Sequence, residues 1–248
     1  MELKIFDTYN QMCEEIALEI AEEVRSNPSL MLSVAAGHTS LGLLESLVRL
    51  HESSEIDFSS GRFVALDEWL GMSDEDSESC AAFLKRNFLD KVNYKNENIR
   101  LFNGKTTNHE AECHSVETFI EKQSKSGVIE YLVLGAGMNG HLGLNEPGSS
   151  FQSRARVVEV DETTQTVGQK YFKEKTEILG GITLGIGNFA QASRSILMIS
   201  GTHKQEILEK IISGPITLEV PATAMRNFNN ATVYCDKDAY GSKDTVKT

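Results

Sequence analysis

Residues 30–41 have the sequence Leu30-Met-Leu-Ser-Val-Ala-Ala-Gly-His-Thr-Ser-Leu41, which carries the clearest signal for the fold class. The segment from Leu30 to Ala36 is a short apolar run of the kind that makes a buried strand. Leucine and valine then recur at helical spacing, at Leu41, Leu44, Leu47 and Val48. The stretch therefore predicts a strand, a loop and a helix in succession, which is the repeating unit of α/β proteins.

The same alternation continues along the chain on both sides of this unit. A helix is predicted at residues 9–26, ended by Pro28, and further helices at 79–89, 108–124, 163–173 and 204–213. Further strands are predicted at 62–66, 130–135, 181–186, 195–200 and 231–235. Apolar strands that alternate with helices predict a doubly wound, Rossmann-like, mostly parallel sheet with helices on both faces.

Composition is consistent with a single domain spanning residues 1–248. Of these residues 40% are apolar, and the 19 glycines and 4 prolines are spread along the chain without a linker-like segment. The cysteines are far apart and lack zinc spacing, so we expect reduced thiols and no metal site. The N-terminus has no signal-peptide pattern, and no apolar run approaches about 20 residues. These features predict a cytoplasmic protein without a membrane partner.

The net charge of the chain limits the classes of ligand that it is expected to bind. A formal charge of −12 argues against nucleic acid or an anionic membrane as partner, because binding either one requires clustered lysine and arginine. A phosphate ester as substrate would need local positive potential from a helix N-terminus and one or two basic side chains.

Ligands of doubly wound sheets bind beyond the carboxyl ends of the strands, which directs attention to the loops after Ala36, Leu66, Gly135 and Ser200. In the first loop, Gly37, His38 and Thr39 precede a helix, where free backbone N–H groups can hold phosphate. The alternative is that Thr39 or Ser40 simply caps the helix.

The second loop contains two adjacent carboxylates, Asp67 and Glu68, followed by Trp69, the single tryptophan. A partly desolvated carboxylate at a strand end can have a raised pKa and act as a general base. The alternative is a pair of ordinary surface carboxylates.

The third loop, residues 135–140, matches the pattern GxGxxG after a predicted strand, and Glu159 follows about 20 residues later as in dinucleotide sites. That fingerprint requires a helix to begin within the motif, and Gly143, Pro147 and Gly148 disfavour one. The other interpretation is a tight glycine turn that directs His141 and Glu146 toward the crevice as an acid/base pair.

Basic candidates follow the predicted strand 195–200. Lys204, next to His203, stands at a helix start, where a cation is unfavourable unless an anion compensates it. Lys170 is a second candidate for contact with an anion. The remaining histidines, His51, His109 and His114, are expected to be structural or inert.

Taken together, these segments resemble the glucosamine-6-phosphate deaminase/isomerase family, which is related to 6-phosphogluconolactonases. The resemblance runs in order through nearly the whole chain. Its motifs are Gly37-His-Thr39, Leu66-Asp67-Glu68-Trp69-Leu-Gly71, Arg86-Asn87-Phe88, residues 98–104, Gly137-Met-Asn-Gly-His141, Asn145-Glu146-Pro147, Ser153-Arg154 and residues 183–187.

The resemblance implies a cofactor-free and metal-free reaction on a small phosphosugar, glucosamine 6-phosphate or galactosamine 6-phosphate, which yields the ketohexose 6-phosphate and ammonia. It implies that Asp67 moves a proton between C2 and C1, and that His141, assisted by Glu146, opens the sugar ring. It further implies that the phosphate is bound by Gly37, His38, Thr39, Lys170 and Lys204.

The chain departs from the family pattern at several positions. Asn139 replaces the aspartate that pairs with the catalytic histidine, and an asparagine carbonyl can orient the ring but cannot stabilise an imidazolium. Lys170 replaces an arginine, and His38 replaces a glycine. Arg156 is retained from the allosteric site, but Val158 and Glu159 replace other residues of it, so we expect no allosteric regulation.

Two other functions fit the same scaffold: a 6-phosphogluconolactonase-type hydrolase and a non-catalytic phosphosugar sensor. The Asn145-Glu146-Pro147 segment favours the amino-sugar enzymes. Sensors of this kind carry an additional helix-turn-helix domain, whereas here the α/β pattern begins by about residue 9. The sequence leaves open whether the chain forms a homo-oligomer.

Overall fold

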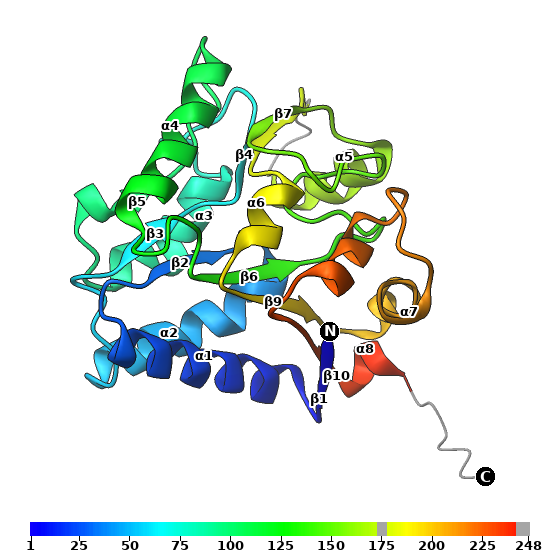
Figure 1. Cartoon of the computed structure of the whole chain (residues 1–248), viewed down its shortest axis with the longest axis horizontal. Helices are drawn as coiled ribbons and strands as arrows, with labels where there is room; N and C mark the ends of the chain where they lie inside the picture. Colours follow the sequence, from blue (N-terminus) through cyan, green and yellow to red (C-terminus); the bar gives the residue numbers. More distant parts are fainter. Residues whose placement is uncertain (173–177, 242–248) are drawn as a thin grey trace.

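A seven-stranded parallel sheet forms the centre of the computed structural model, which describes residues 1–172 and 178–241 (Figure 1). The strand order is β1-β10-β9-β6-β2-β3-β5, and each adjacent pair is parallel. The strands are β1 (Glu2–Phe6), β2 (Met31–Val34), β3 (Arg62–Val64), β5 (Ile99–Arg100), β6 (Tyr131–Gly135), β9 (Arg194–Ile199) and β10 (Ala231–Asp236). The predicted doubly wound α/β fold is confirmed.

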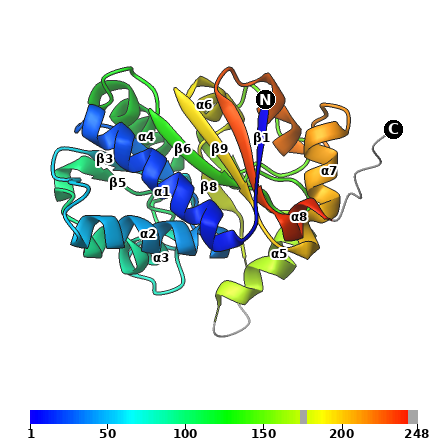
Figure 2. The ribbon, with the colours of Figure 1, turned by 90° about the horizontal axis from the view of Figure 1, so that it is seen from below.

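Helices cover both faces of this sheet, as Figure 2 shows. One face packs against α1 (Tyr9–Ser26), α2 (Leu41–Glu52) and α3 (Cys80–Asn87). The other packs against α4 (His109–Gln123), α6 (Ile186–Gln191) and α7 (Gln205–Ser213). Alternate residues of each strand supply the two cores: in β6, Tyr131 and Val133 face the first and Leu132 and Leu134 the second. Burial on both faces explains why the strands are apolar runs.

Helix α1 shows how local sequence sets the element boundaries. The Thr8 hydroxyl accepts a hydrogen bond from the Gln11 N–H at 3.2 Å and caps the first turn. The buried side chains recur every three to four residues along one face, which packs on the sheet. The helix ends at Ser26, just before Pro28, as predicted.

The order of the strands locates a crevice between β2 and β6. From β2 the chain builds outward through β3 and β5, then returns to add β6 on the other side of β2. Two connections therefore leave in opposite directions at the carboxyl ends of β2 and β6, and such a switch point is where open α/β sheets bind ligands.

One predicted strand does not belong to the parallel sheet. Residues 181–186 were expected to join the parallel sheet, but β8 (Gly181–Thr183) pairs antiparallel with β4 (Asp67–Trp69) and β7 (Arg156–Val158) in a separate three-stranded sheet. Ile186 instead begins α6. A short apolar run does not reveal its strand partner, because partners are chosen by tertiary contact.

Several boundaries also differ from prediction. Strands β1, β4, β5 and β7 were not predicted, and all but β1 are only two or three residues long. The helix expected at 163–173 is α5 (Glu162–Gly168) followed by a 3₁₀ turn, η4 (Gln169–Tyr171), and its last predicted residue lies outside the described part of the chain. In residues 1–172 and 178–241, no helix has the length and apolarity required to cross a bilayer.

Candidate active site

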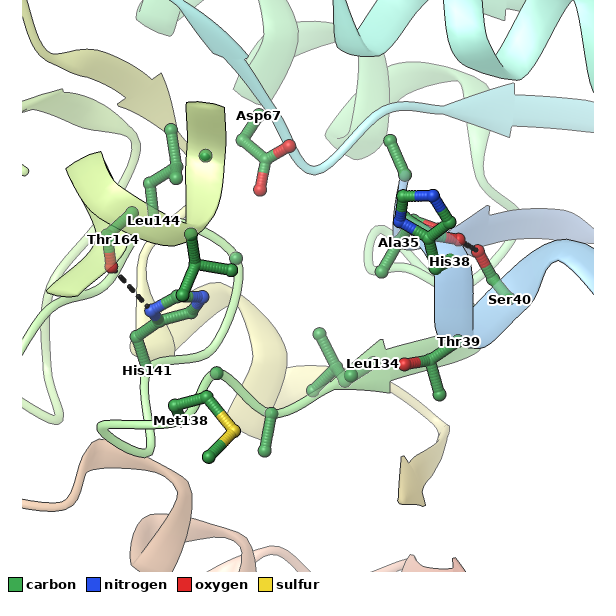
Figure 3. A pocket seen from close by; sticks show the side chains of 18 of the residues that line it. Ala35, His38, Thr39, Ser40, Asp67, Leu134, Met138, His141, Leu144 and Thr164 are labelled. Atoms are coloured by element: carbon green, nitrogen blue, oxygen red, sulfur yellow. Dashed lines mark hydrogen bonds between the residues drawn. The ribbon is translucent and has the colours of Figure 1, made fainter. Parts of the chain in front are cut away.

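A cavity of about 670 Å³ opens at the switch point (Figure 3). Strand β4 and the segments after β2 and β6 line it, together with α5, η4 and the 3₁₀ turn η5 (Thr202–Lys204). The structure brings together most of the residues proposed from the sequence: Gly37, His38, Thr39, Asp67, Asn139, His141, Lys170 and Lys204 all line this cavity. Glu146 lies behind His141 and is 7% exposed.

The loop between β2 and α2 is a 3₁₀ turn, η1 (His38–Ser40), and it carries no helix cap. The Ser40 hydroxyl donates to the carbonyl oxygens of Ala35 and Gly37, at 2.6 and 2.8 Å, so it satisfies loop carbonyls instead of helix N–H groups. The alternative that Thr39 or Ser40 caps α2 is therefore wrong. Among the described residues, the backbone N–H groups of Gly37 and Thr39 have no hydrogen-bond partner and are available to an anion.

Tyr9, at the start of α1, holds this loop in place and was missed by the sequence analysis. Its hydroxyl donates to the Thr39 carbonyl at 3.0 Å and accepts from the Gly42 N–H at 2.8 Å. An aromatic residue at a helix start gives no sequence signal for such a contact, because its partner lies about 30 residues away.

Asp67, the first residue of β4, places its carboxylate on the cavity wall. Burial raises the pKa of Asp67 to about 6, an effect that hydrogen bonding by Cys80 and the charge of nearby His141 partly oppose. In Figure 3 its carboxylate points into the space between His141 on one side and His38 on the other. A carboxylate with this pKa can both accept and release a proton near neutral pH.

The adjacent Glu68 has a different role because neighbouring residues of a strand point to opposite sides. Glu68 is fully buried and accepts hydrogen bonds from the backbone N–H groups of Trp69, Cys80 and Ala81, at 2.8, 3.0 and 2.9 Å. It therefore ties β4 to the N-terminus of α3. Burial raises its pKa to about 7, and these three donors counteract the increase.

The glycine-rich segment after β6 is a tight turn, which contradicts the dinucleotide-site alternative. The Gly137 N–H donates to the His141 carbonyl, the Gly140 N–H donates to the Gly137 carbonyl, and Gly140 has φ +83°. Ala136 and Leu142 then form an isolated antiparallel bridge, so no helix begins within the motif. The turn places the His141 ring on the cavity wall, as the second interpretation predicted.

The His141 ring has two partners on its Nδ1 edge. Nδ1 lies 3.0 Å from the Thr164 hydroxyl oxygen of α5 and 3.5 Å from Glu146 Oε2. The first contact is the dashed line between Thr164 and His141 in Figure 3. Thr164 was missed by the sequence analysis, because its place in a predicted surface helix gave no sign that its hydroxyl is buried.

Asn139 does not orient the His141 ring through its carbonyl, contrary to expectation. Its carbonyl oxygen accepts from the His141 backbone N–H at 3.2 Å. Its amide nitrogen donates to Glu146 Oε2 at 2.7 Å and to Asp161 Oδ1 at 3.0 Å. The negative charge nearest the ring is therefore that of Glu146, whose Oε2 lies 3.5 Å from His141 Nδ1.

Asn145 and Arg156 stabilise the loop that follows His141. The fully buried Asn145 amide donates to the carbonyls of Leu142 and Leu184, both at 2.8 Å. Arg156 donates to Asn145 Oδ1 at 2.8 Å and to the Ser149 hydroxyl at 3.1 Å. The arginine retained from the allosteric pattern thus has a structural contact in this chain.

Two lysines supply positive charge to the cavity. Lys204 Nζ donates to the Ala136 carbonyl at 2.6 Å, and burial, together with the neighbouring Lys170, lowers its pKa to about 8. The two cations are therefore near each other in an acidic protein, and an anion placed between them would restore the pKa of Lys204. Within the described residues, no group of three or more His, Cys, Asp or Glu side chains is arranged to hold a metal ion.

Comparison with known proteins agrees with this geometry. The family model of glucosamine-6-phosphate isomerases and 6-phosphogluconolactonases matches residues 6–234. The chain belongs to this family. Within it, a glucosamine-6-phosphate deaminase of Thermoanaerobacter sp. (strain X514) is 34% identical over 240 residues, which cover 96% of this chain and 94% of that protein.

Solved structures of the family have the same fold. A glucosamine-6-phosphate deaminase described as monomeric superimposes with a TM-score of 0.92 at 31% identity, covering 97% of this chain and 99% of that one. A 6-phosphogluconolactonase from Leishmania guyanensis has a TM-score of 0.76 at 18% identity, covering 98% of both chains. The second likeness shows the shared fold alone.

Proposed function

We propose that this chain is a cytoplasmic hexosamine-6-phosphate deaminase that isomerises an amino aldose phosphate to the ketohexose phosphate and releases ammonia. The observation that carries this proposal is the cavity itself, where a carboxylate with a pKa of about 6, a histidine and two lysines converge at the switch point. The deaminase relatives, identical to this chain at about one residue in three over 96% of its length, support it.

The proposed reaction begins with anchoring of the phosphate. The N–H groups of the Gly37–Thr39 loop and the cations of Lys170 and Lys204 bind the dianion at one end of the cavity. This contact holds the sugar in the cavity that Asp67 and His141 also line, so the reacting groups meet in a fixed orientation and need no random encounter.

Proton transfers then complete the isomerisation. His141, with Glu146 behind it, exchanges a proton with the ring oxygen and opens the pyranose. Asp67 removes the proton from C2 and returns it to C1, and a second proton passes from the amino nitrogen to the C1 oxygen, so the amino aldose becomes a C2 imine with a C1 hydroxyl. Water adds to this imine and ammonia leaves, so the atoms balance without a redox step.

A three-substrate assay tests this function against the lactonase alternative. Purified protein is incubated separately with glucosamine 6-phosphate, galactosamine 6-phosphate and 6-phosphogluconolactone, and ammonia, ketohexose 6-phosphate and acid release are measured. We expect ammonia and ketose in equal amounts from at least one amino sugar. Lactone hydrolysis without ammonia release would refute the deaminase function, and binding without turnover of any substrate would indicate a sensor.

Lys204→Ala should raise KM for the hexosamine phosphate by about 10- to 30-fold, since a charge-assisted hydrogen bond to phosphate contributes about 1.5–2 kcal/mol. We expect kcat to change much less, because the phosphate is remote from the reacting carbons. Steady-state kinetics and titration with inorganic phosphate measure both effects.

Lys210→Ala is the matched control for this substitution. Lys210 lies in α7, is exposed and pairs with Glu206 at 2.6 Å, away from the cavity. Its removal changes the net charge by the same amount. If both variants raised KM equally, the effect would be a general loss of positive charge, and Lys204 would not bind the phosphate.

A further inference from the structure

The Asn139 side chain joins two carboxylates that would otherwise repel each other. Its amide nitrogen donates one hydrogen to Glu146 Oε2 and the other to Asp161 Oδ1. Asp161 Oδ1 also accepts from the N–H groups of Thr163 and Thr164, at 2.8 and 3.1 Å, and caps α5. A neutral amide is suited to this place because it supplies two donors, whereas an ionised carboxylate supplies none.

This bridge determines where α5 lies relative to His141. Asp161 is the residue before the helix, and Thr164 is in its first turn, so tying Asp161 to the turn that carries Asn139 brings the Thr164 hydroxyl within 3.0 Å of Nδ1. The same segment continues through η4 to Lys170, which lines the cavity. One element therefore carries a contact to His141 and a cation for the phosphate.

The Nδ1 contacts bear on which ring nitrogen holds the proton. Both neighbours of Nδ1, the Thr164 hydroxyl oxygen and Glu146 Oε2, can accept a hydrogen bond. A proton on Nδ1 leaves the Nε2 lone pair free toward the cavity, which a ring-opening base requires. A hydrogen-bond acceptor at one ring nitrogen commonly fixes the proton there and leaves the other nitrogen unprotonated.

We propose that Thr164 is a positioning residue, whose hydroxyl holds His141 in the Nδ1–H form at the orientation set by the Asn139–Asp161 bridge. This inference rests on the proposed function for its kinetic consequence, but the state of the ring is a property of the protein without substrate. Thr164 touches neither sugar nor phosphate in this account and acts through His141.

The test compares Thr164→Val, Thr164→Ser and Thr166→Val. Valine keeps the shape of threonine and removes the hydroxyl, serine keeps the hydroxyl, and Thr166 is an exposed residue of the same helix that does not line the cavity. Nitrogen-15 NMR of the His141 ring reads the tautomer directly, and steady-state kinetics on the best amino-sugar phosphate give kcat and KM.

We expect Thr164→Val to shift His141 toward the Nε2–H form and to lower kcat about five- to tenfold, the value of one hydrogen bond, with little change in KM. Thr164→Ser should restore both, and Thr166→Val should match the parent. An unchanged tautomer in Thr164→Val, or equal losses in Thr166→Val, overturns the inference. If the parent does not turn over any amino sugar, the proposed function fails, and the NMR comparison still decides this inference.

Discussion

Replacing Asp67 by asparagine is expected to lower kcat by at least about 10²-fold while KM stays within about threefold. Asparagine keeps the size and hydrogen bonding of the side chain but cannot accept the C2 proton. Steady-state kinetics on the preferred hexosamine phosphate measure the effect. Near-parental kcat in Asp67→Asn would remove this carboxylate from the mechanism.

The neighbouring carboxylate provides the control. Glu68→Gln should retain most of kcat but lower Tm. Glutamine would place an NH₂ group against one of the three backbone N–H groups that now donate hydrogen bonds to the Glu68 carboxylate. Opposite outcomes for two adjacent acidic residues would separate a group that reacts from a group that holds β4 to α3.

The pKa of Asp67 also predicts how stability depends on pH. Its folded pKa, about 6, lies above the ordinary aspartate value of 3.8, so the protonated form favours the folded state. That contribution is fully present below about pH 4 and is lost as the pH rises through about 6. Asparagine stays neutral at every pH, so Asp67→Asn does not lose this stabilising contribution as the pH rises. The Tm of Asp67→Asn minus the Tm of the parent should therefore be larger at about pH 8 than at about pH 4. Activity of the parent should rise over the same interval, as the base ionises.

Gly137→Ala is expected to lower kcat by at least about 10²-fold, because a misplacement of about 1 Å in a catalytic group has an effect of this size. A Cβ at this position would lie 2.6 Å from Nε2 of His141 and closer still to Cε1 and Nδ1, so the ring must move. Gly137 does not have positive φ, so alanine imposes no backbone strain and the fold should persist.

Gly140→Ala distinguishes displacement of the ring from damage to the turn. Gly140 has φ +83°, and its Cβ would meet Val220 Cγ1 at 2.6 Å, so this change strains the turn itself and should lower Tm. Gly137→Ala should instead lose turnover at nearly unchanged Tm. Parental kcat in Gly137→Ala would show that His141 does not need its observed place for the reaction.

Patterns in the sequence were enough to predict the class of fold and to place the candidate site. Apolar runs alternating with helical periods identify strands buried on both faces, because burial on both faces removes polar residues from the strand. Strand ends in such a sheet meet at one edge, so the loops containing Gly37, Asp67 and His141 could be assigned to one crevice from their order alone. The GxGxxG segment could be interpreted correctly because the glycines and proline after it disfavour a helix.

The partners of those residues could be seen only in the folded chain. The antiparallel sheet of β4, β7 and β8 was not predictable, because three-residue strands contain too few positions for a period and their pairing depends on distant neighbours. The separate roles of Asp67 and Glu68 follow from which side of β4 faces the cavity. The amide of Asn139 turned out to bridge two carboxylates, and Thr164 to contact His141, because α5 packs over a turn about 20 residues earlier in the chain. Such contacts depend on side-chain direction across elements, which spacing along one segment does not encode.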